Sequence, residues 1–207
     1  SKISYPWAYN SKVEGMYPHD LVMAGKLLDE AGYPVGADGV RFTTTALCDR
    51  GDVRIVDITE ILREQLKKVG IDVVMQALDK ATLVQRIFLT ATFDLYVGDT
   101  GQGSDPSIGI ERYYVTEYIP PVATNHNANE YSNPEVDKLF YLGRTTIDQN
   151  KRGQYYREVQ LILLKDLPTL TLTDNPKFAA FPKKVRGVNE RRFWSHYYAP
   201  SDAWFSQ

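Results

Sequence analysis

The first half of the chain alternates between two patterns. In some stretches apolar residues recur every three or four positions, and in shorter ones they alternate with polar residues. The first pattern predicts a helix over residues 21–31, with Asp20 placed to cap its start and Gly32 to end it. An alternating run at residues 40–44 then predicts a strand. This helix and strand are the first of three similar units.

The second and third units repeat the plan. Residues 55–69 carry the clearest apolar stripe of the chain, which stops at a glycine and leads into the alternating residues 71–75. In the third unit Asp79 is placed to cap a helix that includes residues 83–88, and a strand is expected over residues 93–97. Helices and strands that alternate at these lengths predict right-handed crossovers and a largely parallel sheet. We therefore expect an α/β fold with a mixed, mostly parallel sheet flanked by helices.

The second half is predicted to be mainly helical. Asn133 and Pro134 open a helix that continues through Phe140, and a longer helix over residues 148–166 is ended by Pro168. Strands are predicted at the end of the chain, over residues 169–173 and 178–181. The last residues are too aromatic for a free tail and are expected to pack on a surface. They include Trp194, Tyr197, Tyr198, Trp204 and Phe205.

Composition narrows the class of partner. The chain has 24 Lys and Arg against 26 Asp and Glu, and positive charge is not concentrated in any run, so a nucleic-acid partner is not expected. No stretch approaches the roughly 18 apolar residues of a membrane span. The single cysteine, Cys48, excludes an internal disulfide and leaves both the cytosol and the periplasm open. We expect it to be a buried strand residue, with a catalytic thiol as the alternative.

Residues 93–106 hold the most informative motif. An alternating strand runs into three glycines and two carboxylates, Asp99 and Asp105, and such loops often carry ligand contacts at the carboxyl edge of an α/β sheet. Three interpretations of Asp99 and Asp105 are open. They could form an acid/base pair, serve as turn or solvated loop residues, or contact a ligand. Arg50 follows an earlier strand and is expected at the same edge. It either pairs with a neighbouring aspartate or holds a ligand carboxylate.

Other chemistry is not indicated, and we expect no metal and no cofactor. The three histidines lack further ligands at metal-binding spacing, and the chain has neither a dinucleotide fingerprint nor a nucleophilic serine elbow. His126 lies between Asn125 and Asn127 in an amide-rich loop. That loop is expected either to line a cleft or to serve turn formation alone.

Several segments, in order and at matching spacing, resemble the peptide-type solute-binding proteins of bacterial ABC importers. No single motif carries the resemblance, but together the segments cover nearly the whole chain. They are residues 17–33 (Tyr-Pro-His-Asp through Ala-Gly-Tyr), 61–73 (Ile-Leu-Arg-Glu-Gln-Leu-Lys-Lys-Val-Gly-Ile-Asp-Val), 93–106, 131–137 (Tyr-Ser-Asn-Pro-Glu-Val-Asp), 152–168 and 185–187 (Val-Arg-Gly).

The resemblance implies the carboxyl-terminal portion of an oligopeptide, dipeptide or nickel-type binding protein, with a type II periplasmic-binding-protein-like lobe. Two lobes of such a protein close on a ligand by hinge motion. Residues 1–175 are then the ligand-binding lobe, and residues 176–207 a hinge-return segment that packs on this lobe or on a first lobe outside the chain. The chain is expected to cross the hinge near residues 170–175. The resemblance also implies export, to the periplasm or to a membrane-anchored extracellular position, with the signal sequence outside this chain.

Site residues are carried over only where positions match. In dipeptide binders the loop reads Gly-Trp-Thr-Gly-Asp-Asn-Gly-Asp-Pro, which aligns without gaps on residues 98–106. The ligand-packing aromatic is Asp99 here, and the aspartate that pairs with a peptide's amino group is Gln102. Arg50 falls near the arginine that holds the peptide carboxylate. The expected ligand-binding residues are Arg50, Tyr96, Asp99, Thr100, Gln102 and Asn125.

Three function classes follow. The leading hypothesis is a monomeric receptor without enzymatic activity that delivers a peptide or peptide-like solute to an ABC permease in the membrane. Its ligand would place a carboxylate near Arg50 and a cation or hydroxyl-rich group near Asp99 and Gln102. The alternatives are an α/β hydrolase-type enzyme that uses Asp99 and Asp105, and an interaction domain without a small ligand.

Overall fold

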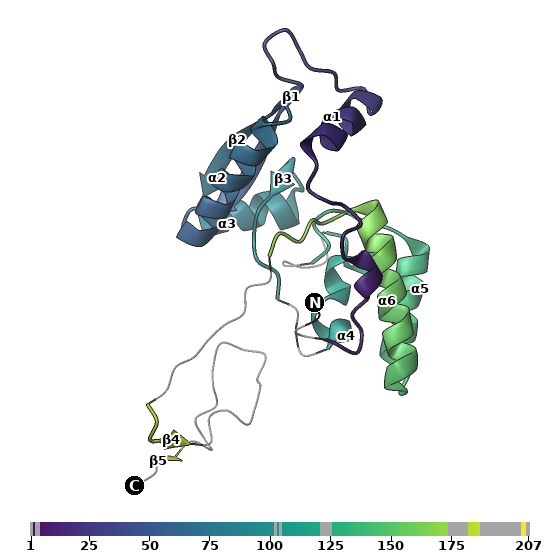
Figure 1. Cartoon of the computed structure of the whole chain (residues 1–207). Coiled ribbons are helices and arrows are strands. Elements are labelled where there is room, and N and C mark those ends of the chain that lie inside the picture. Colours follow the sequence, from purple (N-terminus) through teal and green to yellow (C-terminus); the bar gives the residue numbers. More distant parts are fainter. Residues whose placement is uncertain are drawn as a thin grey trace. The chain divides into compact units, whose positions relative to one another are not determined.

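The computed structural model divides into two compact units (Figure 1). The sheet unit comprises Ser11–Thr100 and Arg112–Asp137, and the helical unit comprises Ser1–Asn10, Gly101–Glu111 and Lys138–Gln207. Each unit is described by itself. The residues that the structure describes are 2, 5–101, 103, 105–120, 126–173, 182–186 and 204–205.

A three-stranded parallel sheet forms the centre of the sheet unit. Its strands β1 (Phe42–Asp49), β2 (Ile71–Leu78) and β3 (Leu95–Tyr96) lie in the order β2-β1-β3. β1 and β2 pair over their whole length, from Phe42 opposite Ile71 to Asp49 opposite Leu78. The parallel sheet predicted from the alternation of helices and strands is thus confirmed.

β3 is shorter than the predicted strand over residues 93–97. The backbone N–H of Thr45 donates to the Asp94 side chain (2.9 Å), so a carboxylate takes the place that a ladder carbonyl would have had. Regular pairing then covers only Leu95 and Tyr96. The Val97 N–H still donates to the Leu47 carbonyl (2.9 Å), which keeps the following loop against β1.

Three helices of the sheet unit begin directly after an aspartate cap, and two of these caps, Asp20 and Asp79, were predicted. They are α1 (Leu21–Glu30), α2 (Val53–Lys67) and α3 (Lys80–Val84), and a π-helical turn η2 (Gln85–Leu89) continues α3. The backbone N–H groups in the first turn of a helix have no partner within the helix. In these three helices some of them donate to the side chain of the cap residue, which is Asp20, Asp52 or Asp79. The shorter 3₁₀ turns are η1 (Ser11–Val13) and η4 (Thr116–Tyr118), and η3 (Glu111–Tyr113) lies at the boundary between the units.

The sheet is covered on both faces, because neighbouring residues of β1 belong to two different core clusters. Leu47 packs with Leu83 and Ile87 of the α3–η2 segment. Cys48 packs with Ile55 of α2 and with Val97. Successive side chains of a strand point to opposite faces, so helices lie over both sides of β1, as parallel sheets require. Cys48 is fully buried in β1, which matches the prediction of a small apolar strand residue.

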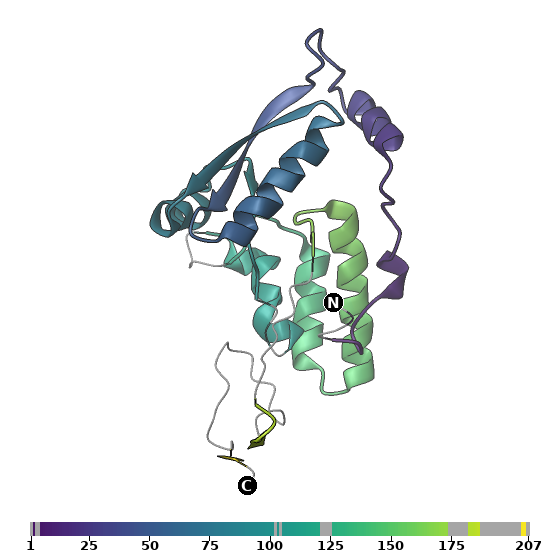
Figure 2. The same ribbon diagram turned by 60° about the vertical axis from the view of Figure 1, so that its left-hand side comes forward.

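The helical unit is built on two adjacent helices, α5 (Pro134–Thr145, in this unit from Lys138 onward) and α6 (Gln149–Asp166). Figures 1 and 2 both show them side by side. Both helices were predicted, although α5 runs five residues past Phe140. Asp148 caps α6, which ends at Leu167 in the left-handed conformation (φ +48°), just before Pro168. A four-residue helix α4 (Pro106–Gly109) completes the unit's helices among the described residues.

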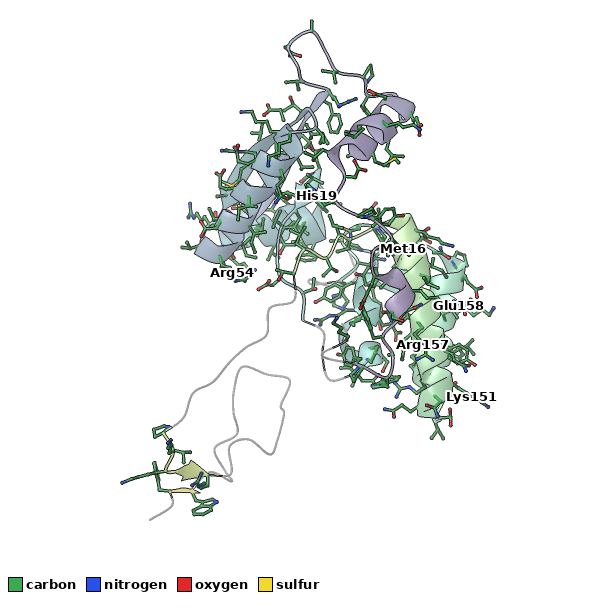
Figure 3. All side chains as sticks on the ribbon, viewed as in Figure 1. Met16, His19, Arg54, Lys151, Arg157 and Glu158 are labelled. Carbon is green, nitrogen blue, oxygen red and sulfur yellow. The ribbon has the colours of Figure 1, made fainter. Side chains whose placement is uncertain are left out.

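The amino-terminal segment of the helical unit is bonded along α6. Asn10 donates its side-chain amide to the Arg157 carbonyl, Gln160 donates to the Ala8 carbonyl, and Arg157 donates to the Trp7 carbonyl, each at 2.7 Å. Figure 3 shows Arg157 on this helix. Side chains of α6 thus satisfy carbonyls that an irregular segment would leave unpaired.

Two predictions for the end of the chain are changed or left open. Residues 169–173 are not a strand, because no strand of the described residues pairs with them and strand propensity alone does not hold a β-structure. The predicted strand over residues 178–181 lies outside the described residues. β4 (Val185–Arg186) and β5 (Trp204–Phe205) form a short antiparallel pair. Trp204 and Phe205 are exposed in it, so the surface on which the aromatic end of the chain packs stays a prediction.

Two helical glycines should respond oppositely to the same substitution. A Cβ at Gly143 would lie 2.6 Å from two ring atoms of Tyr156, which is held between Trp7 and Phe140. Overpacking therefore outweighs the helix propensity gained, and Gly143→Ala should lower the free energy of unfolding by about 2 kcal/mol. A Cβ at Gly25 of α1 meets only the Arg41 guanidinium, at 3.5 Å.

Gly25→Ala is accordingly the matched control. It should raise the free energy of unfolding by up to about 1 kcal/mol, because alanine favours the helix and fits the space. Urea unfolding of both variants checks the pair. Equal effects of the two substitutions would contradict the close packing of α5 on Tyr156.

Candidate functional site

The ends of the three strands bring the predicted site residues to one edge of the sheet unit. Because the strands are parallel, the segments that follow β1, β2 and β3 all leave from the same edge. We call residues 49–54, 79–80 and 96–100 the carboxyl edge. It combines acidic and basic side chains from three segments that are distant in sequence.

Three aspartates of the carboxyl edge are engaged in local structure. Asp49 accepts a hydrogen bond from the Gly51 N–H (2.9 Å) and lies 3.6 Å from the Lys80 ammonium. Asp52 and Asp79 cap α2 and α3. The backbone and hydroxyl hydrogen bonds from Thr82 lower the pKa of Asp79. Local hydrogen bonds and ion pairs therefore hold these three carboxylates in place.

The fourth aspartate, Asp99, forms a two-point ion pair with Arg54 (Figure 3 labels Arg54). The two guanidinium nitrogens lie 3.2 and 2.5 Å from the two carboxylate oxygens. Arg54 also donates to Asp52 Oδ2 at 3.0 Å. Sequence reasoning missed Arg54, since its partner is 45 residues away and the predicted apolar stripe began only at residue 55. Asp99 thus has an ion-pair partner within the sheet unit, which none of the interpretations of the loop motif included.

Tyr96 lies half-buried at the end of β3, against the Leu47 cluster. Burial, with the nearby charge of Asp49 and Asp99, raises the pKa of its phenol. A Cβ at Gly98 would fall 2.0 Å from the Tyr96 hydroxyl oxygen. The glycine two residues on is therefore what allows the Tyr96 ring to take this position.

The other predicted ligand-binding residues are placed as follows. Arg50 is exposed at the carboxyl edge, and its guanidinium forms no ion pair within the described part of the chain, although it helps to lower the pKa of Asp79. Thr100 is exposed at the end of the same loop. Gln102 and Asn125 lie outside the described residues. Four of the six predicted residues thus fall in one region of the sheet unit.

Asp105 has a structural role within the helical unit. It caps α4, accepts hydrogen bonds from Ser107 and forms an ion pair with Arg152 at 2.6 Å. Burial acts to raise the pKa of Asp105, but the hydrogen bonds from Ser107 and Arg152 prevail and lower it. Burial and the charge of Asp105 raise the pKa of Tyr5 to about 12. A carboxyl with a lowered pKa is a poor general acid, which argues against the acid/base pair with Asp99.

The amide-rich loop owes its shape to Asn127, which is fully buried in the sheet unit. Its side chain donates to the carbonyls of Val115 (3.2 Å) and Tyr131 (2.7 Å) and accepts from the Tyr131 N–H (3.1 Å). His126 stacks on Tyr118 with ring centroids 5.3 Å apart. Turn formation, one of the two interpretations of this loop, therefore accounts for Asn127.

Among the described residues, no three His, Cys, Asp or Glu side chains are grouped as a metal would need. Over that same part of the chain, no helix combines the length and apolar character required to cross a bilayer.

Comparisons with known proteins agree on one family. Residues 2–119, more than half of the chain, match the bacterial extracellular solute-binding proteins, family 5 Middle. Protein XP55 of Streptomyces lividans is 30% identical over 78% of this chain and 29% of its own length. The glutathione-binding protein GsiB of Pectobacterium atrosepticum is 27% identical over 83% of this chain and 33% of its own length.

A solved structure shares the fold. The periplasmic oligopeptide-binding protein of an oligopeptide ABC transporter from Thermotoga maritima, with bound mannohexaose, superposes with a TM-score of 0.68 and 29% identity. The match covers 80% of this chain and 33% of that protein. The chain thus spans about a third of the length of these relatives. Its mixed α/β architecture with a parallel sheet is that of a type II periplasmic binding protein. The chain belongs to the family 5 bacterial extracellular solute-binding proteins.

Proposed function

We propose that this chain is the carboxyl-terminal ligand-binding part of a two-lobed receptor that delivers a peptide or peptide-like solute to an ABC permease. Residues 1–175 form the lobe, and residues 176–207 return across the hinge. The receptor acts outside the cytoplasm, as a monomer that is either free in the periplasm or anchored to the membrane. Family membership and the names of two relatives, a glutathione-binding protein and the oligopeptide-binding protein of an ABC transporter, support this function.

The main support for the proposal is that the aspartates of the carboxyl edge have hydrogen-bond partners, whereas Arg50 has no ion-pair partner among the described residues. Asp49, Asp52, Asp79 and Asp99 each accept hydrogen bonds from neighbouring groups. Arg50, in contrast, exposes a guanidinium that no carboxylate of the described residues neutralises. A guanidinium holds a carboxylate through two parallel charge-assisted hydrogen bonds. Arg50 therefore receives the carboxylate of the ligand, and Tyr96 and Thr100 lie at the same edge of the sheet unit. Gln102 and Asn125 are proposed as further ligand contacts from their sequence positions alone.

Arg50→Ala tests this assignment in the full-length protein. The probes are alanine peptides of two to five residues, each in four forms that carry free or acetylated amino ends and free or amidated carboxyl ends. The substitution should weaken binding of the free-carboxylate forms by about 2 kcal/mol, roughly 30-fold in Kd, and leave the amidated forms unchanged. Titration calorimetry gives the values.

Arg63→Ala is the matched control, because Arg63 pairs with Glu60 on the surface of α2 and is not part of the carboxyl edge. It should leave all four Kd values unchanged. Equal loss for free and amidated peptides would show that Arg50 does not hold the carboxylate. Conversion of any probe to product would favour the enzyme alternative, and complete absence of binding would favour an interaction domain.

A further inference from the structure

We propose that the Arg54–Asp99 ion pair sets the charge selectivity of the carboxyl edge by preventing Asp99 from binding a cationic group of the ligand. The inference rests on the proposed function. The inference adds the class of ligand to that function. The ligand has an anionic group that binds Arg50 and, near Asp99, a neutral hydrogen-bonding group rather than an ammonium. Of the two groups that the sequence suggested near Asp99, a cation or a hydroxyl-rich group, this inference favours the second.

The geometry of the pair is the first support. Arg54 lies in the first turn of α2, and Asp99 lies in the loop after β3, so the pair joins two of the three segments of the carboxyl edge. Both carboxylate oxygens of Asp99 are contacted, at 3.2 and 2.5 Å. The guanidinium nitrogen that contacts Asp99 Oδ2 also donates to Asp52 Oδ2, at 3.0 Å. Two carboxylates thus contact the Arg54 guanidinium, and one of them, Asp52, also caps α2.

The hydrogen bonds to Asp99 are the largest contribution that raises the pKa of Arg54, followed by the charges of Asp99 and Asp52. Protonated arginine is therefore the only relevant form of this group in the pH range of a bacterial envelope.

An ammonium that approached Asp99 would face two costs. It would have to displace a two-point charge-assisted contact, and it would then lie beside the Arg54 guanidinium, a like charge at short range. A hydroxyl or amide N–H faces neither cost. A carboxylate offers about four lone-pair positions, so hydrogen bonds from Arg54 leave acceptor capacity for a neutral donor. The pair thus favours neutral groups over cations at this position.

The experiment removes the guanidinium and asks whether an ammonium takes its place. In the full-length protein, Kd is measured by calorimetry for the free-amine and acetylated alanine peptides defined above. The wild type should bind the two forms within about threefold of each other. Arg54→Gln should favour the free-amine form by tenfold or more, because Asp99 is then available. Arg54→Lys keeps the positive charge and should retain the wild-type ratio.

The double variant Arg54→Gln with Asp99→Asn distinguishes electrostatics from altered shape. It should return the ratio to the wild-type value, since no carboxylate remains to hold the ammonium. A wild type that already prefers the free amine tenfold, or an Arg54→Gln ratio that does not change, would overturn the inference while leaving the proposed function intact. If none of the probes bound the wild type or any of the variants, both the inference and the proposed function would be overturned.

Discussion

Replacing Asp105 with asparagine is expected to lower the free energy of unfolding by about 3 kcal/mol at pH 7, because it leaves the Arg152 guanidinium without its countercharge. The side chains of Arg152 and Asp105 are only 19% and 24% exposed, and Arg152 also lies over the rings of Trp7 and Tyr156. Asparagine keeps the size and the acceptor that cap α4, so the loss reports mainly on the charge. Urea unfolding followed by circular dichroism measures it.

The stabilisation that Asp105 gives to the folded state should decrease as the pH falls. The pKa of Asp105 is lowered in the folded state, so the carboxylate stabilises the fold above the unfolded value of about 3.9. That stabilisation is lost as pH falls through the folded pKa. The difference between wild type and Asp105→Asn should therefore be constant between about pH 5 and 7 and shrink below about pH 4.

Glu60→Gln is the control for Asp105→Asn. It removes the carboxylate from an exposed pair with Arg63 at 2.8 Å, where solvent screens the charge, and should cost less than about 1 kcal/mol. Equal losses for the two variants, or a difference for Asp105→Asn that persists unchanged at pH 3.5, would rule out the partly buried pair as the cause.

Asn127→Ala should have an effect of similar size in the sheet unit. The substitution removes three side-chain hydrogen bonds, to the Val115 carbonyl and to both backbone groups of Tyr131, at a site with no access to solvent. Loss of partners for buried backbone groups should lower the free energy of unfolding by about 3 kcal/mol.

The matched control is Asn150→Ala, at an exposed position of α6. It should change the free energy of unfolding by less than about 0.5 kcal/mol. Differential calorimetry of the two variants compares them directly. A small effect of Asn127→Ala would mean that its loop does not depend on the buried amide.

The elements that the sequence predicted well are those determined by neighbouring residues. Asp20 and Asp79 cap helices and Gly32 follows one in the left-handed conformation, all as expected, because caps and glycine turns act within a few residues. Residues 169–173 have the composition of a strand, but a strand also needs a partner, which local composition does not specify. The length of β3 was overestimated for a related reason. Asp94 bonds to the neighbouring strand through its side chain, a contact 49 residues away.

In the candidate site, too, some features could be predicted from the sequence and others depend on contacts between distant residues. Parallel strand order alone predicts that Arg50 and Asp99 lie at one edge, and the structure places both there. The partner of Asp99 could not be predicted in this way. Arg54 has the spacing of any solvent-facing helical arginine, and only the three-dimensional approach of α2 to the loop after β3 gives it a role.

The reactivity of the buried Cys48 can be used to measure how often the sheet unit opens. Cys48 is the only thiol in the chain, and it lies without solvent access in the central strand of the sheet unit. Burial also raises the pKa of the thiol, so little reactive thiolate forms while the fold is closed. The rate at which a thiol reagent modifies it therefore follows the opening of this unit alone. The stability of the part that carries the carboxyl edge can thus be followed in the unmodified protein, without introducing a label.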